Sequence, residues 1–317
     1  MSISTVSRAL RGYTDVNPGT RARVQQAALE LGYIPDAAGQ ALKSGRTGTV
    51  AVLVSGSHGP TFLDAFYAEV VGGIETHLAE NGLGLLLMRS GSVKPGWLQG
   101  GRCDGVIALG CDLPVALLHS LDEGGVPLVL ADSEGGWAGW RPEIPSVTVA
   151  NEAGGFEATR HLLERGRCRV AFIAETPDDP NFLRRRQGYL RAHAEMDREV
   201  KPERQHSGQL GPDGGYLATR KLLAATPFDA IFAANDTAAF GALRALAEVG
   251  VRVPDDVAVV GFDDIALSRY SHPPLTTVRI PRQQLGLEAA AQLLARLGGK
   301  PAASPQLPVS LVVRSSS

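Results

Sequence analysis

The sequence predicts an α/β protein of two doubly wound, parallel-sheet lobes preceded by a small all-α segment. Three observations lead to this fold class. Apolar runs suited to buried strands recur after residue 48, amphipathic helical segments separate them, and the first 34 residues contain two helical patterns. Strands that are apolar on both faces are typical of a parallel sheet covered by helices. The chain of 317 residues, 44% hydrophobic, is long enough for two or three compact units.

The first expected helix begins close to Met1. Ile3, Val6 and Leu10 follow the spacing of a buried stripe, whereas the run TVSR at residues 5–8 carries short polar side chains and one arginine. A helix of this kind can pack inward on one face and read bases with the other.

A second helix is expected from Asn17 to Gly32. Asn17 is a good N-cap, Pro18 suits the first helical position, and Gly32 is a typical helix end. Its expected apolar stripe consists of Val24, Ala27, Ala28 and Leu31.

Strands and helices alternate from Thr49 onward. Strands are expected at 50–54, 84–88, 105–109 and 126–130, with helices near 64–81 and 113–123. The crossover between Met88 and Asp104 is too short for a full helix, so a stunted one is expected there. A second series has a helix capped by Asn151 and Glu152 that runs through Leu163, then strands at 170–173, 230–233 and 257–260. The ligand crevice of two such lobes should lie at the carboxyl ends of their strands.

Charge and cysteine content narrow the class of protein. The whole chain has a formal net charge of −2, but residues 1–47 carry six basic and three acidic side chains, a net charge of +3. The basic footprint is therefore N-terminal. Three cysteines, an odd number, argue against a disulfide framework and favour the cytoplasm. No apolar run approaches the roughly 18 residues of a membrane span, and the N-terminus lacks the apolar region of a signal peptide.

Motifs of catalysis are missing from the sequence. It contains no phosphate-binding P-loop, no Gly-x-Ser-x-Gly and no His or Cys cluster with metal-ligand spacing. We therefore expect neither an enzyme nor a bound metal or cofactor. The pairs Gly72-Gly73 and Gly154-Gly155 lack dinucleotide-binding spacing and are interpreted as packing sites.

Four motifs carry a family resemblance. TVSRAL, VNPGTRARV, AALELGYIPDAAGQAL and RTGTVAVLV resemble the lactose-repressor/galactose-repressor family of bacterial transcription regulators, and the match continues almost to the C-terminus. The resemblance implies a helix-turn-helix headpiece, a hinge helix and a periplasmic-binding-protein-like domain. In that family a further short helix comes first, and Met1 stands where the family usually has Val. We therefore expect a truncated helix-turn-helix whose first helix is encoded upstream of Met1.

The resemblance also implies the domain boundaries. The expected parts are a partial headpiece over 1–34, a hinge helix and linker over 35–47, and an effector-binding and dimerisation domain over 48–317. The first lobe of that domain is expected to span about 48–149 plus about 280–303, and the second lobe about 150–279 plus about 304–317.

The DNA-contacting residues are implied in the same way. Ile3, Ser4 and Arg8 would face the major groove, with Arg8 suited to a guanine edge. Thr5 and Ser7 would hold phosphates.

The hinge helix is expected over 35–44, with Asp36 as its cap and Leu42 as a wedge in the minor groove. Gly39 departs from the usual Ala and should weaken this helix by about 1 kcal/mol. The alternative is a flexible linker.

Polar residues that follow predicted strands are the candidates for the effector site. Asp132, Asn235 and Asp263 each follow an apolar run, and their side chains should converge on the crevice. The resemblance adds Arg185, three residues before a Gly, and a wall made by Ser55, Phe66 and Tyr67. The expected effector-binding residues are thus Ser55, Phe66, Tyr67, Asp132, Arg185, Asn235 and Asp263.

Several of these residues have structural alternatives. The alternative for Asn235 and Asp236 is that one of them caps the helix 238–248 and so serves the fold. Asp264 is expected to be structural, Phe66 or Tyr67 could belong to the core, and the neighbours Arg184 and Arg186 could be solvated surface charges.

The aromatic side chain that many family members stack on a sugar ring is replaced here by Leu210 or a near neighbour. Trp137 and Trp140, in the Gly-rich loop after Asp132, are possible substitutes, and a loop or subunit contact is the alternative.

The expected function is therefore a ligand-responsive, homodimeric, DNA-binding transcription regulator. It would be a repressor of a pseudo-palindromic operator, with DNA affinity changed by a small carbohydrate-like effector, and the first lobe, including helix 66–81, would form the dimer face. The alternatives are a solute-binding protein or a small-molecule enzyme on the same fold, and an effector-binding regulator whose truncated headpiece cannot bind DNA.

Overall fold

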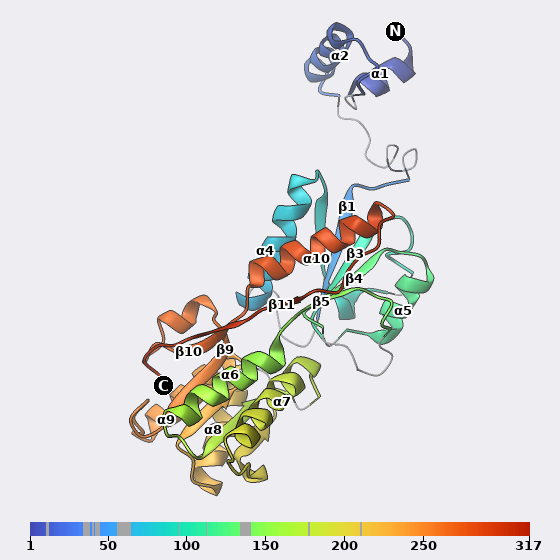
Figure 1. The fold of residues 1–317 in the computed structure, drawn as a ribbon. Helices are drawn as coiled ribbons and strands as arrows, with labels where there is room; N and C mark the ends of the chain where they lie inside the picture. The colour runs from blue at the N-terminus through green and yellow to red at the C-terminus, as the bar shows by residue number, and fades with distance from the viewer. Residues whose placement is uncertain are drawn as a thin grey trace. The chain divides into compact units, whose positions relative to one another are not determined.

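The computed structural model describes most of the chain. The described residues are 1–10, 13–33, 39, 41, 45–55, 65–94, 96–111, 113–133, 141–176, 178–209 and 211–317. They form two compact units, residues 1–47 and 48–317, which are described separately (Figure 1).

The first unit contains α1 (Ile3–Leu10) and α2 (Pro18–Glu30). The Asn17 side chain accepts a hydrogen bond from the Gly19 amide at 2.9 Å, which confirms the expected N-cap. A small core gathers around Ala9, Val16 and Val24. The expected stripe of α2 is only partly buried, because α1 covers the part of α2 around Val24, whereas Ala27 is exposed and Leu31 is 82% exposed.

The second unit contains two six-stranded sheets, which confirms the expected two-lobed α/β fold. The first sheet has the order β11-β5-β4-β3-β1-β2, and all its neighbours are parallel. Its strands are β1 (Thr49–Val54), β2 (Gly84–Arg89), β3 (Gly105–Leu109), β4 (Leu128–Ala131), β5 (Ser146–Val149) and β11 (Gln306–Leu307).

The second sheet has the order β12-β10-β9-β8-β6-β7, and only β10 and β12 are antiparallel. Its strands are β6 (Val170–Ala174), β7 (Gln205–Ser207), β8 (Ala230–Ala233), β9 (Ala258–Asp263), β10 (Thr276–Arg279) and β12 (Ser310–Val312).

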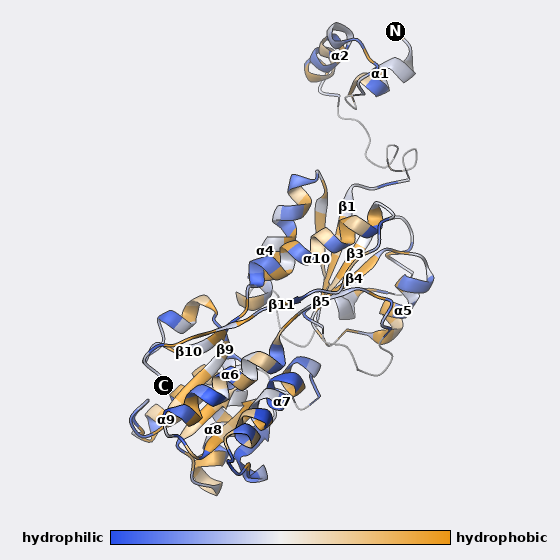
Figure 2. Ribbon diagram, viewed as in Figure 1, coloured by the Kyte–Doolittle hydropathy of each residue, from blue (hydrophilic) through white to orange (hydrophobic). Residues whose placement is uncertain are grey.

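Helices cover both sheets, and the central strands are the most apolar part of each lobe (Figure 2). In the first lobe α4 packs against α10, and in the second lobe α6 packs against α7 and α8 against α9. The helices are α4 (Ala65–Glu80), α5 (Val115–Glu123), α6 (Asn151–Glu164), α7 (Pro180–Glu195), α8 (Pro212–Ala225), α9 (Asp236–Glu248) and α10 (Arg282–Leu297). None of the helices in the described part of the chain is both long and apolar enough to cross a membrane.

The crossover between β2 and β3 is stunted, as expected. Its described residues contain one short 3-10 turn, Ser90–Ser92, in place of an α-helix.

The chain passes between the two lobes three times. It crosses from β5 to α6, from β10 to α10 and from β11 to β12 (Figure 1). The expected boundary near residue 303 differs from the structure, because β11 pairs with β5 and so extends the first lobe to Leu307. The edge position beside β5 needs a hydrogen-bonding partner, and the segment after α10 fills it.

Paired glycines allow two pairs of helices to touch through their backbones. A Cβ atom built on Gly73 would lie 2.2 Å from the Gln283 carbonyl oxygen, and one on Gly155 would lie 2.2 Å from the Arg185 carbonyl oxygen. A Cβ atom built on Gly154 would lie 2.6 Å from the Phe262 ring. These three glycines are packing sites, as expected, whereas Gly72 has no atom within 4 Å of such a Cβ, so the packing interpretation is wrong for it.

Candidate functional site

One row of side chains lies at the carboxyl edge of the first sheet. Leu109 of β3 is paired with Val54 of β1 and with Ala131 of β4, so the next residues of the three strands, Ser55, Gly110 and Asp132, lie side by side. The backbone pairing continues there, since the Ser55 amide donates to the Leu109 carbonyl at 3.1 Å and the Gly110 amide to Ala131 at 2.9 Å.

Phe66 and Tyr67 lie in the first turn of α4, and their rings meet edge to face with centroids 5.5 Å apart. Both side chains belong to the main hydrophobic core. The Tyr67 hydroxyl nevertheless reaches the strand edge, because a Cβ atom built on Gly110 would lie 2.8 Å from it.

A matching row lies at the carboxyl edge of the second sheet. The pairing of β6 with β8 and of β8 with β9, continued past the last paired residues, aligns Glu175, Asn235 and Asp263. The Asn235 side chain caps α9 by accepting from the Ala238 amide at 3.0 Å, so the capping alternative is confirmed for Asn235.

Arg185 is buried between the second sheet and α6. Its Nε donates to Oδ1 of Asn151 at 2.8 Å and its Nη1 to the Ala234 carbonyl at 2.5 Å. The same Nη1 lies 3.5 Å from Oδ1 of Asp263, and the guanidinium stacks on the Phe262 ring at 3.9 Å. Two expected effector residues are therefore in direct contact.

The position of Arg185 is fixed by its helix. Glycines on both helices let α6 and α7 touch, since a Cβ atom on Gly188 would lie 2.1 Å from the Glu152 carbonyl oxygen. Asp179 caps α7 by accepting from the Asn181 amide at 2.8 Å. By contrast Arg184 and Arg186 are exposed on the outer face of α7, as the surface-charge alternative predicts.

Two asparagines link the rows of the two lobes. Nδ2 of Asn181 donates to the Asp132 carbonyl at 3.1 Å, and Nδ2 of Asn151 donates to Oδ1 of Asn181 at 3.2 Å. Asn151 also holds Arg185, so a continuous polar chain runs from Asp132 to Arg185 and Asp263. The expectation that Asn151 caps α6 is wrong, because Asn151 is the first helical residue and its side chain is used in these longer-range bonds.

Asp263 is the most strongly perturbed acid of the site. Burial raises the pKa of its carboxyl well above the usual range, the charge of Arg185 lowers it, and the charge of Asp236 raises it further. Smaller contributions come from Arg282, which lowers the pKa, and from Asp132, which raises it. These charges are therefore close to one another.

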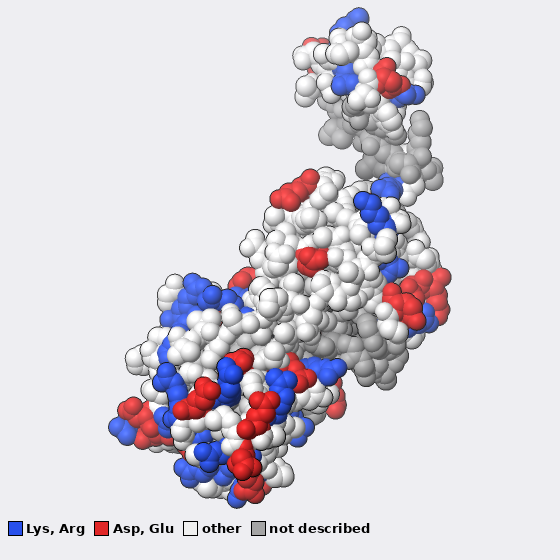
Figure 3. Space-filling view, viewed as in Figure 1, with Lys and Arg blue, Asp and Glu red and all other residues white. Residues whose placement is uncertain are grey.

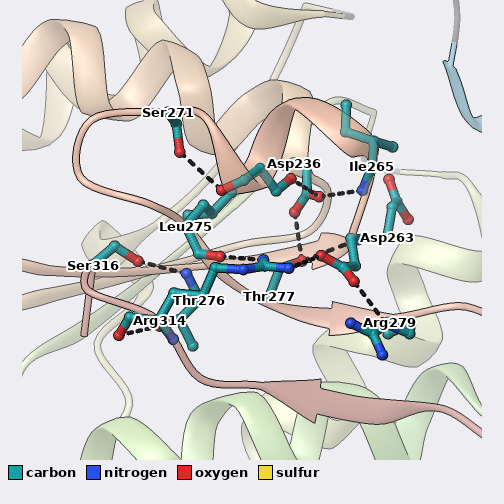
Figure 4. A network of polar contacts seen from close by, with 12 residues as sticks. Asp236, Asp263, Ile265, Ser271, Leu275, Thr276, Thr277, Arg279, Arg314 and Ser316 are labelled. Atoms are coloured by element: carbon teal, nitrogen blue, oxygen red, sulfur yellow. Dashed lines mark hydrogen bonds and ion pairs between the residues drawn. The ribbon is translucent and has the colours of Figure 1, made fainter.

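Asp236 is held inside the second lobe by a network of polar contacts (Figure 4). The Asp236 carboxylate accepts from the hydroxyls of Ser268 and Thr277, both at 2.5 Å, and burial raises its pKa to about 6. Asp264 forms ion pairs with Arg279 at 2.6 Å and Arg314 at 2.5 Å and is buried, which confirms its structural role.

Four polar residues of this region were not predicted from the sequence: Asn151 in its bridging role, Glu175, Asn181 and Arg282. The carboxylate of Glu175 accepts from the Gly211 amide at 2.9 Å and from the Thr237 hydroxyl at 2.7 Å. Its position directly after β6 was the same signal that identified Asp132. The other three contacts depend on residues far away in the sequence.

The expected DNA-contacting residues lie on α1. Ser4 and Arg8 are exposed, and Thr5 and Ser7 are half-buried. The Arg8 guanidinium forms an ion pair with Asp15. Ile3 is the first residue of the helix.

Several expected residues lie outside the described part of the chain: Asp36 and Leu42 of the hinge, the tryptophans Trp137 and Trp140, and Leu210. Within the described ranges no group of three or more His, Cys, Asp or Glu side chains is gathered as a metal site.

Comparison with known proteins gives two family matches. Residues 1–36 match the model of bacterial regulatory proteins of the lacI family, and residues 159–317 match that of the periplasmic binding protein-like domain. The transcriptional regulator CelR of Thermobifida fusca is 38% identical over 308 residues, covering 93% of this chain and 88% of the relative. The transcriptional repressor CytR of Escherichia coli K12 is 31% identical over 327 residues, covering 100% and 93%.

The solved structures that match over the whole chain include the following two. A complex of the regulator CelR with cellobiose has a TM-score of 0.79 at 36% identity and covers 100% of this chain and 96% of that one. The lac repressor dimer bound to operator and the anti-inducer ONPF has a TM-score of 0.85 at 25% identity, with coverage of 100% and 95%.

Proposed function

Because the chain belongs to the LacI family of bacterial regulatory proteins, we propose that it is a cytoplasmic, homodimeric repressor whose operator affinity is changed by a small carbohydrate. The headpiece around α1 reads the operator, and the crevice between the two lobes binds the effector. The expected effector residues Ser55, Phe66, Tyr67, Asp132, Arg185, Asn235 and Asp263 line that crevice in the proposal.

One observation carries the carbohydrate assignment: the contact between Arg185 and Asp263. Arg185 uses Nε and Nη1 for its contacts with Asn151, Ala234 and Asp263, and Asp263 meets it through Oδ1. A guanidinium donor group and a carboxyl group are therefore held in contact, and each has a further polar atom to offer a ligand. Neighbouring hydroxyls of a sugar each accept one hydrogen bond and donate another, which matches this pair. The cellobiose bound to the related CelR is in keeping with a neutral sugar.

The operator assignment rests on α1 and on the family match of residues 1–36. Arg8 would have to exchange its ion pair with Asp15 for a guanine edge, and an exposed pair of this kind is weak enough to open. On the face of the molecule shown in Figure 3, acidic and basic side chains alternate over the second lobe. Such a mixed surface does not attract a polyanion strongly.

A thermal-shift titration tests the effector site. Cellobiose, ribose and other mono- and disaccharides are added to the wild-type protein, and the true effector at 100 times its Kd should stabilise the fold by about 2.7 kcal/mol. Arg185→Ala should abolish that increase in Tm, and the exposed neighbour Arg184→Ala should keep it.

Arg185→Ala also leaves the buried partners of Arg185 without their hydrogen bonds and ion pair. The substitution should therefore lower the unfolding free energy by roughly 3 kcal/mol by itself. Arg185→Lys is therefore included, because it keeps the charge but loses the fork that reaches Asn151 and Ala234. An undiminished effector response in both Arg185 variants would contradict the assignment.

The relatives are transcriptional regulators, and we propose that this chain likewise performs no catalysis. Incubation with the effector followed by chromatography of the sugar tests this point, and accumulation of a product would favour the enzyme alternative.

A further inference from the structure

Arg282 stands at the second crossover between the lobes, as the first residue of α10. Its side chain is 92% buried, being only 8% exposed, and its Nε has no hydrogen-bond partner among the described residues. An arginine placed at such a junction touches both lobes. The sequence motifs did not single it out.

On the side of the second lobe, Arg282 holds the turn that carries Asp263. Its Nη1 donates to the Asp263 carbonyl, and its Nη2 donates to the Asp264 carbonyl at 2.9 Å. Asp263 and Asp264 have φ angles of 118° and 54°, which side-chain-bearing residues rarely adopt. A turn of this kind needs outside support for its carbonyl groups, and the planar fork of one guanidinium provides it.

On the side of the first lobe, Arg282 forms an ion pair with Glu69 of α4. Nη2 lies 3.0 Å from Oε2 of Glu69. The two helices that carry this pair are locked together, because a Cβ atom on Gly73 of α4 or on Gly286 of α10 would lie within 2.2 Å of a carbonyl oxygen of the other helix. Arg282 and Glu69 therefore move as part of one body, and the turn belongs to the other lobe.

We propose that Arg282 is a positioning residue that couples the effector-binding turn at Asp263 to helix α4 of the first lobe. The inference rests on the proposed function, since it assigns the contacts through which effector binding changes the position of the first lobe. A ligand that hydrogen-bonds the Asp263 carboxylate displaces the turn, and the two carbonyl bonds pass the displacement to Arg282. Because α10 and α4 are locked, the first lobe then shifts as a whole. The ion pair with Glu69 keeps the Arg282 guanidinium in the orientation in which Nη1 and Nη2 donate to the carbonyls of Asp263 and Asp264.

The test uses Glu69→Gln, which removes the ion pair without touching the crevice residues. Glu75→Gln is the matched control, because Glu75 is an exposed glutamate of the same helix without an ion pair among the described residues. The probe is the saccharide that raises the wild-type Tm, with cellobiose as the first compound tested. Three quantities are measured on the full chain: the Kd for the saccharide, the operator Kd with and without saturating saccharide, and the hydrogen exchange of residues 65–74 with and without it.

Glu69→Gln should bind the saccharide within about threefold of wild type, yet its saccharide-induced change in operator Kd should shrink by about fivefold or more. The saccharide should alter hydrogen exchange in α4 of the wild type and of Glu75→Gln, and not in Glu69→Gln. Arg282→Lys should reproduce the loss of response, because lysine keeps the charge without the fork.

A Glu69→Gln protein with wild-type operator response and wild-type exchange in α4 would overturn the coupling role of Arg282. A wild-type protein that binds no saccharide, or whose operator affinity does not respond, would instead overturn the proposed function. The hydrogen-exchange measurement needs no DNA, so the coupling role is tested even where operator binding is weak.

Discussion

Two adjacent glycines of α4 should respond to the same substitution with opposite signs. Gly72 is exposed, and a Cβ built on it meets no atom within 4 Å. Gly73 faces α10, and its Cβ would lie 2.2 Å from the Gln283 carbonyl oxygen. Because both residues are in the same helix, the gain in helix propensity on replacement by alanine is the same for each. The difference between the two variants therefore measures the contact with α10 alone.

The magnitude follows from the distances. Real Cβ atoms essentially never come closer than 3.0 Å to such an atom, so Gly73→Ala must push α4 and α10 apart by about 1 Å, a gap that forfeits a quarter to a half of each dispersion contact across the interface. Overpacking of this kind costs about 1–3 kcal/mol or more, and helix propensity returns about 1 kcal/mol. Gly72→Ala should thus stabilise the protein by up to about 1 kcal/mol. The propensity gain cancels between the two variants, so Gly73→Ala should be about 1–3 kcal/mol less stable than Gly72→Ala.

Urea titrations and thermal melts of the two variants give the answer. At about 2–4 °C per kcal/mol for a unit of this size, the two Tm values should differ by roughly 2–12 °C. The slope of the urea transition should stay unchanged, since neither substitution alters the surface exposed on unfolding. Equal stability of the two variants would refute the close approach of α4 and α10, and with it the rigid joint on which the role of Arg282 depends.

Three further predictions address other parts of the chain. The pKa of Asp236 is about 6 in the folded protein against 3.8 for the free side chain. The stability that comes from protonating this carboxyl is therefore fully present below pH 3.8 and is lost as the pH rises through 6. Urea titrations should show that the unfolding free energy of wild type gains about 2 kcal/mol relative to that of Asp236→Asn between about pH 7 and 4.5, and no gain would contradict the burial of Asp236. Ser316→Ala removes a buried hydroxyl with two hydrogen bonds and should lower the unfolding free energy by about 1–3 kcal/mol, whereas the exposed Ser315→Ala should leave it unchanged. Leu42→Ala should weaken specific operator binding far more than non-specific binding at one fixed salt concentration, and an equal loss on both DNAs would exclude a wedge.

Local signals in the sequence predicted much of the fold. Asn17 followed by Pro18 identified the start of α2, and continuous apolar runs identified the central strands of both sheets. The strands β5, β7, β10, β11 and β12 were not predicted. Three of them, β7, β11 and β12, are only two or three residues long, too short to show a pattern of their own. The other two, β5 and β10, are as long as the predicted β4 and β8, but polar side chains interrupt their apolar residues (SVTV and TTVR), so they lack a continuous apolar run.

The candidate site was predictable only where it follows strands. Asp132, Asn235 and Asp263 follow apolar runs, and parallel strands end at one edge, so their positions could be derived. Asn151 was predicted as a cap because its local sequence suits one. Its side-chain oxygen instead accepts a hydrogen bond from Arg185, 34 residues away. The bond between Arg282 and Glu69 spans 213 residues, and no short-range pattern reports a contact of that kind.

The three passages of the chain between the lobes bear on how the protein is made. The first lobe begins with β1, at Thr49, but its sheet is not complete until β11 has been made. The helix α10, which packs against α4 and against β3, β4 and β5, is also made late. A ribosome adding about 5–20 residues per second therefore holds an unfinished first lobe until Leu307 has emerged. The second lobe is completed later still, by β12 at Ser310–Val312. Both lobes thus close at nearly the same moment, and nascent chains stalled before α10 should expose apolar surface to chaperones.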